Sequence, residues 1–531
     1  MREILYIQAG SQANYIGTHF WNTQGSYFAC EEGDTGTTAA EVQGREVSQE
    51  VSFREGLDQT GESTYCPRLL IFDYKAEFGS LSQANALYGM DSHADEKIPW
   101  SAPISRSGET VEHLQEPVRR SQYQIDMEEL DVEDREVSST AQLEDIFFWS
   151  DFNRLYYLPR TVQKIPDKSE WEDVEGNWAV GHETFARYDE DTGLMEGPLR
   201  LFLEECETFQ GIQLTLDTPK FGSFATSLLT SLRDEGTKAP VLALPLLSNI
   251  VMPFNHVETR LSTRKVVNDA LVLRDLSELA SVSIPIQPPT AWPDDLCTNA
   301  YMHASRAHVY HTSAILSTHI ETATLPLRMN AATDDIYSLA AQLGEGTMLP
   351  FSELRGVFPC ADALGLDSRI YNFSCTIPRT LQPTHFRRDV TRGFSPSAIA
   401  YYNEWARSSG SGADSSHLRS THAGAYPLPS SFPAFFFSSP TADVLTRPRS
   451  ATVFSALGGA SRGTSALLGA YARFVGGCAR RGVPTPLELG LERDDVTELA
   501  ADLWALYDRA SELGAEDGGD TDTESHGEDE E

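Results

Sequence analysis

The chain begins Met1-Arg2-Glu3-Ile4-Leu5-Tyr6-Ile7-Gln8-Ala9-Gly10-Ser11-Gln12-Ala13-Asn14-Tyr15-Ile16-Gly17-Thr18-His19-Phe20-Trp21. Residues 4–7 are a short apolar run that predicts a buried strand of a parallel sheet. Gly10 permits a tight turn, and the apolar residues after it fall on one face of a helix. A strand, a glycine turn and a helix in this order present free backbone N–H groups to an anion. The stretch therefore indicates an α/β domain. It is only a modest hint of a nucleotide site, because many α/β domains begin this way.

Length and composition indicate a globular protein of two or three domains. The chain has 531 residues, 40% of them hydrophobic, which is enough for several substantial cores. No apolar stretch approaches the roughly 18 residues of a membrane-spanning helix, so no transmembrane segment is predicted. The amino terminus resembles neither a secretory signal nor a transit peptide. We therefore expect the protein in the cytosol or on the cytosolic face of an organelle.

The charge balance argues against nucleic-acid binding. Lysine and arginine number 41 against 78 acidic residues, which gives a formal net charge of −37. Such a field repels phosphate backbones and anionic lipid, so we expect no direct contact with nucleic acid. Basic partners remain open, beside the simpler explanation that the charge serves solubility and acidic disordered segments.

No metal site or catalytic signature is predicted. The seven cysteines are scattered and contain no Cys-x-x-Cys pair, which argues against structural zinc and a disulfide framework. His303, His308, His311 and His319 lie near one helix, but no nearby carboxylate or thiol completes a ligand set. We therefore interpret them as surface or capping histidines.

Alternating strand and helix patterns predict a doubly wound sheet. The pattern gives a helix at 199–209, a strand at 212–215, a helix at 224–233 and a strand at 241–247. The aromatic run 146–159 is expected to pack on the main domain, with partner docking as the alternative. The predicted organisation is an N-terminal α/β domain (1–90 and 171–307), an acidic, partly disordered insertion with an aromatic segment (91–170), a central helix (308–328), a second α+β domain (329–464), C-terminal helices (465–513) and a disordered acidic tail (514–531).

Motifs in matching order along residues 1–340 resemble those of tubulins. The opening stretch resembles their first strand, glycine loop and helix. The resemblance extends to Pro67–Asp73, Asn177-Trp178-Ala179-Val180-Gly181-His182, Cys206–Thr215, Asn268-Asp269-Ala270-Leu271 and Ser317–Arg328. It implies a tubulin-like nucleotide-binding-type domain, a second α+β domain and a C-terminal helical region.

The acidic insertion and the run Phe148–Arg160 resemble the Misato family, which is related to tubulins. The resemblance implies a non-enzymatic role in mitochondrial partitioning and mitochondrial-DNA inheritance, with some members linked to microtubule organisation. It implies a peripheral location on the cytosolic face of the mitochondrion and in the cytoplasm. Expected partners are mitochondrial outer-surface or cytoskeletal proteins, tubulin or the cytosolic chaperonin. Two alternatives remain open: a GTP-binding, filament-forming GTPase, and an assembly factor associated with tubulin or the chaperonin.

The phosphate loop departs from the tubulin pattern. Tubulins carry a run of glycines after the position of Thr215, whereas this chain has Leu216-Asp217-Thr218-Pro219-Lys220-Phe221-Gly222-Ser223-Phe224. Pro219 removes a backbone donor, and Asp217 brings negative charge toward a phosphate. The sequence therefore predicts that tight triphosphate binding and GTPase activity are lost, and that the chain has no catalytic residue.

Some nucleotide contacts implied by the resemblance survive. A weak GTP or GDP site, and a degenerate pocket that keeps the same residues for packing and capping, are both open. Asp334 and Asp335, after the central helix, are expected to form a solvated helix start and not a hydrolytic site. The candidate nucleotide-binding residues are Gly10, Ser11, Gln12, Asn14, Gly222, Ser223 and Asn268.

Overall fold

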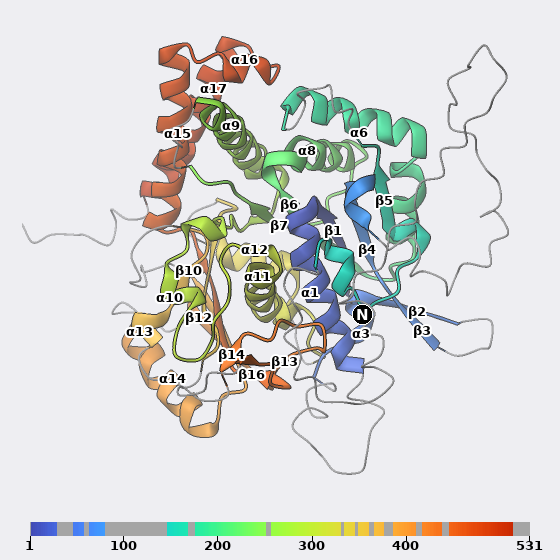
Figure 1. The fold of residues 1–531 in the computed structure, drawn as a ribbon, viewed down its shortest axis with the longest axis vertical. Coiled ribbons are helices and arrows are strands. Elements are labelled where there is room, and N and C mark those ends of the chain that lie inside the picture. Colours follow the sequence, from blue (N-terminus) through green and yellow to red (C-terminus); the bar gives the residue numbers. More distant parts are fainter. Residues whose placement is uncertain are drawn as a thin grey trace, which may run out of the picture.

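Two main sheets, of six and five strands, lie on either side of a long central helix (Figure 1). The computed structural model describes residues 2–28, 46–57, 63–79, 146–167, 176–250, 256–330, 334–345, 349–360, 366–375, 386–409, 417–437 and 445–512. The predicted tail 514–531 and most of the predicted insertion, residues 91–145, lie outside these ranges. Within the described residues, no helix combines the length and apolar character needed to cross a bilayer.

The larger sheet is parallel throughout and has the order β5-β4-β1-β6-β7-β8. The first strand, β1, is flanked by β4 on one side and β6 on the other, so the sheet is wound in both directions from β1. The strands are β1 (Glu3–Ala9), β4 (Leu69–Tyr74), β5 (Val162–Ile165), β6 (Phe209–Asp217), β7 (Val241–Leu246) and β8 (Val282–Ser283).

Helices cover both faces of this sheet, which explains why its strands are apolar runs. Ile4 and Tyr6 of β1 point into a core shared with α1 (Ser11–Phe28) and α11 (Val309–Thr324). Leu5 and Ile7 point into the opposite core. That second core includes α6 (Trp178–Thr192), α8 (Thr218–Asp234), α9 (His256–Leu279), α15 (Arg462–Arg481) and α17 (Arg493–Glu512).

The second sheet packs against the other side of α11, and its order is β10-β9-β17-β11-β12. Glu321 of α11 forms buried ion pairs with Arg392 of the second sheet and with Arg328, at 2.8 and 3.1 Å. The Tyr27 hydroxyl of α1 also donates to Glu321 Oε1, so this carboxylate joins both halves of the molecule. The strands are β9 (Ser352–Val357), β10 (Tyr371–Asn372), β11 (Arg387–Arg392), β12 (Leu418–Ala423) and β17 (Val453–Gly459).

Shorter elements complete the described chain. The helices are α3 (Gln49–Ser52), α7 (Arg200–Glu204), α10 (Asp294–Cys297), α12 (Ile336–Leu343), α13 (Leu366–Arg369), α14 (Pro396–Ser409) and α16 (Thr485–Glu488). The strands are β2 (Phe53–Leu57), β3 (Ser63–Pro67), β13 (Tyr426–Pro427), β14 (Phe436–Phe437), β15 (Leu445–Thr446) and β16 (Ser450–Ala451).

Three expectations need correction. The range 91–170 is not wholly an insertion, because β5 pairs with β4 at the edge of the larger sheet. The helix expected at 199–209 is only α7, preceded by a π-helical turn (Met195–Leu199), because Phe209 already belongs to β6. The helix expected from 224 begins at Thr218, directly after β6. Residues 218–223 are therefore helical and do not form a loop.

Candidate functional site

Three adjacent strands, β4, β1 and β6, end side by side at the carboxyl edge of the larger sheet. Open α/β sheets bind ligands at this edge, where the winding direction reverses. Asp73 is the second-last residue of β4, Gly10 follows β1, and Asp217 ends β6. Together with Gln12 and Asn14 of α1, these residues are called the carboxyl-edge cluster below.

The Asp217 carboxylate lies on the first turn of α1. The Gln12 backbone N–H donates to Asp217 Oδ2 at 3.0 Å. Gly10 has a φ of 103°, and a Cβ placed on it would lie 2.6 Å from Asp217 Cβ. Glycine is therefore required here both by backbone conformation and by the close approach of Asp217. The carboxylate takes the position at which a helix N-terminus would hold an external anion.

Burial makes the charged form of Asp217 costly. The residue is 5% exposed, and burial raises its pKa to about 7, with the nearby charge of Asp73 adding to the increase. Hydrogen bonds from the Gln12 and Ala13 backbone and the charge of Lys220 act in the opposite direction. Its Oδ1 atom is buried without a hydrogen-bond partner among the described residues. The group therefore titrates near neutral pH.

Asp73 is also held by the protein's own side chains. Its Oδ2 atom accepts hydrogen bonds from Asn14 Nδ2 at 2.9 Å and from Trp149 Nε1 at 3.1 Å. Burial raises the pKa of Asp73 to about 7, although these hydrogen bonds and one from the Tyr74 backbone oppose the increase. Asn14 also donates to the Phe72 carbonyl at 3.1 Å. Both acidic groups at the edge thus have protein partners.

Trp149 belongs to the aromatic segment 146–159, which was predicted to pack on the main domain and does so at α1. Trp149 and Phe152 are each 1% exposed. The Tyr15 hydroxyl donates to the Phe147 carbonyl at 2.9 Å, and Asn22 Nδ2 donates to the Phe152 carbonyl at 2.8 Å. The segment therefore helps to close the carboxyl edge.

The remaining predicted site residues are divided between this edge and the helix packing behind it. Ser11 lies at the edge, where its hydroxyl donates to Glu77 at 3.4 Å. Gly222 lies inside α8, where an added Cβ would come within 2.6 Å of Val272 on α9. Ser223 is buried against Gly181 of α6. Gly222 and Ser223 thus serve helix contacts in this structure.

Asn268, which the tubulin resemblance assigns to the guanine base, forms hydrogen bonds with backbone groups of the chain. Its Nδ2 atom donates to the carbonyls of Gly176 and Pro219, at 2.7 and 3.0 Å. The neighbouring Asp269 accepts hydrogen bonds from Thr218, Ser248 and Tyr471. These two residues thus connect α9 to the first turn of α8 and to α15.

The acidic residues after the central helix have structural partners. Asp335 caps α12 by accepting from the Ser338 N–H at 2.7 Å, and it pairs with Arg2 at 3.1 Å. Asp334 forms ion pairs with Arg388 and Arg419. The expected helix start is present, and both carboxylates are engaged within the chain.

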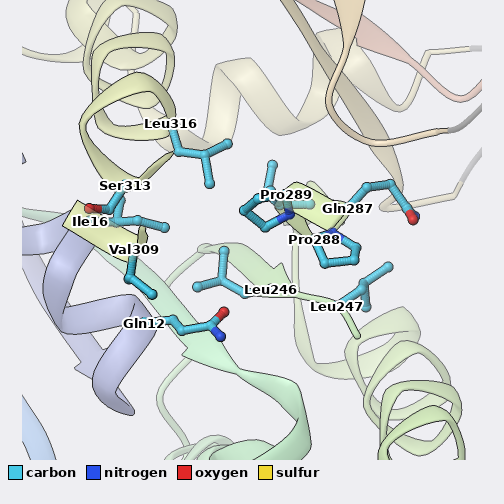
Figure 2. Close-up of a pocket in the computed structure, with 11 residues that line it drawn as sticks. Gln12, Ile16, Leu246, Leu247, Gln287, Pro288, Pro289, Val309, Ser313 and Leu316 are labelled. Atoms are coloured by element: carbon cyan, nitrogen blue, oxygen red, sulfur yellow. The ribbon is translucent and has the colours of Figure 1, made fainter. Parts of the chain in front are cut away.

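A small depression adjoins the cluster, and its empty volume is about 320 Å³ (Figure 2). Gln12, Val309 and Ser313 line one side of it, and Leu247 and Pro288 line the other (Figure 2). None of its lining residues is charged. The depression therefore offers apolar contact and the amide of Gln12, but no cation for a phosphate. The Gln287 amide points away from it and donates to the Ser374 carbonyl at 3.2 Å (Figure 2).

The described residues contain no group of three or more histidine, cysteine or acidic side chains that could hold a metal ion. The helix histidines were interpreted as surface or capping groups, but His311 and His319 are 7% and 0% exposed, so neither is a surface group. Burial lowers the pKa of each to about 3, so both are neutral core residues. His319 Nδ1 lies 2.9 Å from the Ser455 hydroxyl of β17.

The site residues predicted from the sequence did not include Asp73, Trp149 or Asp217. The apolar run Leu69–Phe72 and the strand-like stretch Ile212–Leu216 are each followed directly by an aspartate. Because parallel strands end at one edge, this shared ending could have indicated the acidic pair. Nothing local in the sequence indicated that Trp149 would reach Asp73.

Comparison with known proteins places this architecture in context. Residues 2–129 match the Misato segment II tubulin-like domain, and residues 138–329 match the tubulin domain. Protein DML1 of Gibberella zeae is 32% identical over 379 residues, which cover 70% of each chain. Protein dml1 of Aspergillus clavatus is 31% identical over 398 residues, covering 74% of this chain and 72% of the relative. Protein misato of Drosophila melanogaster is 29% identical over 361 residues, 63% of this chain and 61% of the relative.

Proposed function

Because this chain belongs to the Misato/DML1 family of tubulin-like proteins, we propose that it is a non-enzymatic scaffold for partitioning mitochondria and inheriting mitochondrial DNA. It acts at the cytosolic face of the mitochondrion and in the cytoplasm. Its partners are mitochondrial outer-surface or cytoskeletal proteins, with tubulin and the cytosolic chaperonin among the candidates. The mitochondrial role follows from the family likeness, and the absence of nucleotide turnover is supported by the carboxyl edge.

The observation that carries the proposal is the position of Asp217. Its carboxylate accepts the Gln12 N–H at the start of α1 and rests on Gly10, where a phosphate would otherwise meet the helix N-terminus. A phosphate about 4 Å from an ionised carboxylate would be repelled by about 4 kcal/mol per unit charge at the effective dielectric of a protein surface. Phosphate binding would first require this side chain to move or to be protonated.

The surroundings of Asp217 support the same conclusion. β6 continues into α8 without a loop, and Pro219 in the first turn has no N–H to donate. Both amide hydrogens of Asn268 are used on backbone carbonyls. The groups that the tubulin resemblance assigns to a nucleotide thus stabilise the chain's own helices, and the protein acts through its surfaces.

The proposal is tested by depleting the protein from its native cells and restoring it. We expect depletion to lower the number of mitochondrial DNA copies per cell and to distribute mitochondria unequally at division. Re-expression of the wild-type chain should restore both, with nuclear DNA content as the internal control. Normal mitochondrial DNA and normal organelle distribution after complete depletion would refute the mitochondrial role.

Two further measurements separate the alternatives. GTP-dependent sedimentation of the purified protein would identify a filament-forming GTPase. Selective recovery of tubulin and chaperonin subunits, without mitochondrial surface proteins, would identify an assembly factor. The scaffold proposal predicts no effect of GTP on sedimentation, and recovery of mitochondrial surface proteins from detergent extracts.

A further inference from the structure

Three uncharged polar side chains lie together on one face of the larger sheet. They are Gln8 of β1 and Gln213 and Thr215 of β6, and all three are buried. Residues two apart on a strand share a face, so these side chains point with Tyr6 toward α1 and α11. The strand register places Gln8 beside Thr215, and Tyr6 beside Gln213. Gln8, Gln213 and Thr215 are called the polar triplet below.

A cavity of about 270 Å³ adjoins the polar triplet. The triplet lines the side of the cavity formed by the sheet, and Ile16, Phe20 and Ile320 line the side formed by α1 and α11. Every residue that lines the cavity is buried, and none is charged. The cavity therefore lies inside the core, with one polar side and one apolar side.

The polar side of the cavity includes an acceptor that needs a donor. Gln213 Oε1 is buried and has no hydrogen-bond partner among the described residues. The apolar side chains across the cavity cannot supply a donor. An unsatisfied buried acceptor lowers the stability of the folded state, so a donor inside the cavity would stabilise the protein.

Gly17 of α1 makes room for the amide of Gln8 beside the same cavity. A Cβ placed on Gly17 would lie 2.0 Å from Gln8 Nε2 and 2.3 Å from Gln8 Oε1. Only glycine therefore allows the Gln8 amide to lie between β1 and α1 in this position. The helix and the strand thus hold a second amide at the cavity, in addition to that of Gln213.

We propose that this cavity holds at least one ordered water molecule, which donates to Gln213 Oε1 and accepts from the Gln8 amide or the Thr215 hydroxyl. Cavities that stay dry are apolar, whereas polar cavities of sufficient size are hydrated. A water molecule occupies about 30 Å³ in the liquid, so the cavity has room for it. A charged ligand does not fit the site, because no lining residue has a charge to compensate it. The inference does not depend on the mitochondrial role.

A crystal structure of the full chain, at a resolution that shows buried water molecules, tests the proposal directly. We expect water density within hydrogen-bonding distance of Gln213 Oε1 and of Gln8 or Thr215 in wild type. The variant Gln213→Met keeps the length of the side chain but removes the acceptor, so this density should be lost. Absence of the water in a well-ordered wild-type core would overturn the proposal, as would full density in Gln213→Met.

Gln210→Met is the matched control in the same strand. Gln210 is a buried glutamine that already has protein partners, because it donates to the Arg2 carbonyl at 2.8 Å and accepts from the Ile336 N–H at 3.1 Å. It does not line the cavity, so the water should keep its density in this variant. Loss of the density in Gln210→Met as well would overturn the assignment of the water to the polar triplet.

Thermal unfolding in solution gives an independent test of the bridge. Gln8→Met and Gln213→Met should each lower the Tm, and the double variant should lose clearly less than the sum of the two losses. The losses are not additive because either substitution alone already disrupts the same water bridge. Additive losses of Tm would overturn the claim that one water connects the two side chains.

Discussion

The variant Asp217→Asn should become progressively more stable relative to wild type as the pH rises. In the folded protein, burial raises the pKa of Asp217 to about 7, compared with 3.8 for a free carboxyl group. A folded-state pKa above the unfolded value means that the folded state binds the proton more tightly. The stabilising effect of this proton is complete below about pH 4 and is lost as the pH rises through about 7. Wild-type stability therefore falls over this range because of Asp217.

The magnitude follows from the two pKa values. The full shift corresponds to about 4 kcal/mol at about 1.4 kcal/mol per pH unit. Between pH of about 5.5 and 8.5, the linkage relation gives a loss of about 2 kcal/mol from Asp217 alone. Asparagine keeps an acceptor for the Gln12 N–H, and its amide would occupy the Oδ1 position, which no hydrogen-bond donor of the described residues faces. The variant should therefore fold and escape this loss.

Urea denaturation, monitored by tryptophan fluorescence at several pH values, measures the difference directly. The free energy of unfolding of Asp217→Asn, minus that of wild type, should increase by about 2 kcal/mol from pH of about 5.5 to 8.5. Asp508→Asn, at an exposed position of α17, controls for loss of a surface carboxylate and should show little pH dependence. A pH-independent difference for Asp217→Asn would refute the argument that a buried carboxylate occupies the α1 terminus.

Other substitutions test the core and the closed edge. Glu321→Gln leaves Arg328 and Arg392 buried without a compensating charge, so the free energy of unfolding should fall by about 3–5 kcal/mol. The control Glu183→Gln, at an exposed ion pair, should lower it by less than about 1 kcal/mol, and similar losses in the two variants would contradict this prediction. Trp149→Ala should cost about 3–5 kcal/mol by calorimetry, because it empties a fully buried site, and a loss below about 1 kcal/mol would mean that the aromatic segment is not packed on α1. Trp149→Phe keeps most of the packing but removes the hydrogen bond to Asp73, so the pKa of Asp73, followed by NMR, should rise further; an unchanged or lower value would count against that bond.

The sequence was most informative where its pattern is periodic. The runs that became β1, β4 and β7 were recognised because strands buried on both faces are mostly apolar, and β6 was recognised by the alternation of strand and helix patterns around it. The long helices α11, α15 and α17 followed from their apolar periodicity. The short edge strand β5 was not recognised, because its partner in the sheet is far away in the chain.

The candidate site was only partly predictable. Gly10 and Asn14 were identified from the opening motif, and both lie at the carboxyl edge. The helical state of residues 218–223 was not expected, because the tubulin resemblance suggested a loop there. The contact between Trp149 and Asp73 spans 76 positions and carries no local signal. Any role of the predicted residues in binding a nucleotide stays a prediction.

The central claim is that Asp217 takes the place of a phosphate in a tubulin-like domain. It is tested most directly by mass spectrometry of the nucleotide released from protein purified under native conditions with GTP and Mg²⁺ present. We expect guanine nucleotide far below one molecule per chain. One tightly held GTP or GDP per chain would contradict the account, because it would require the carboxylate to have left the start of α1.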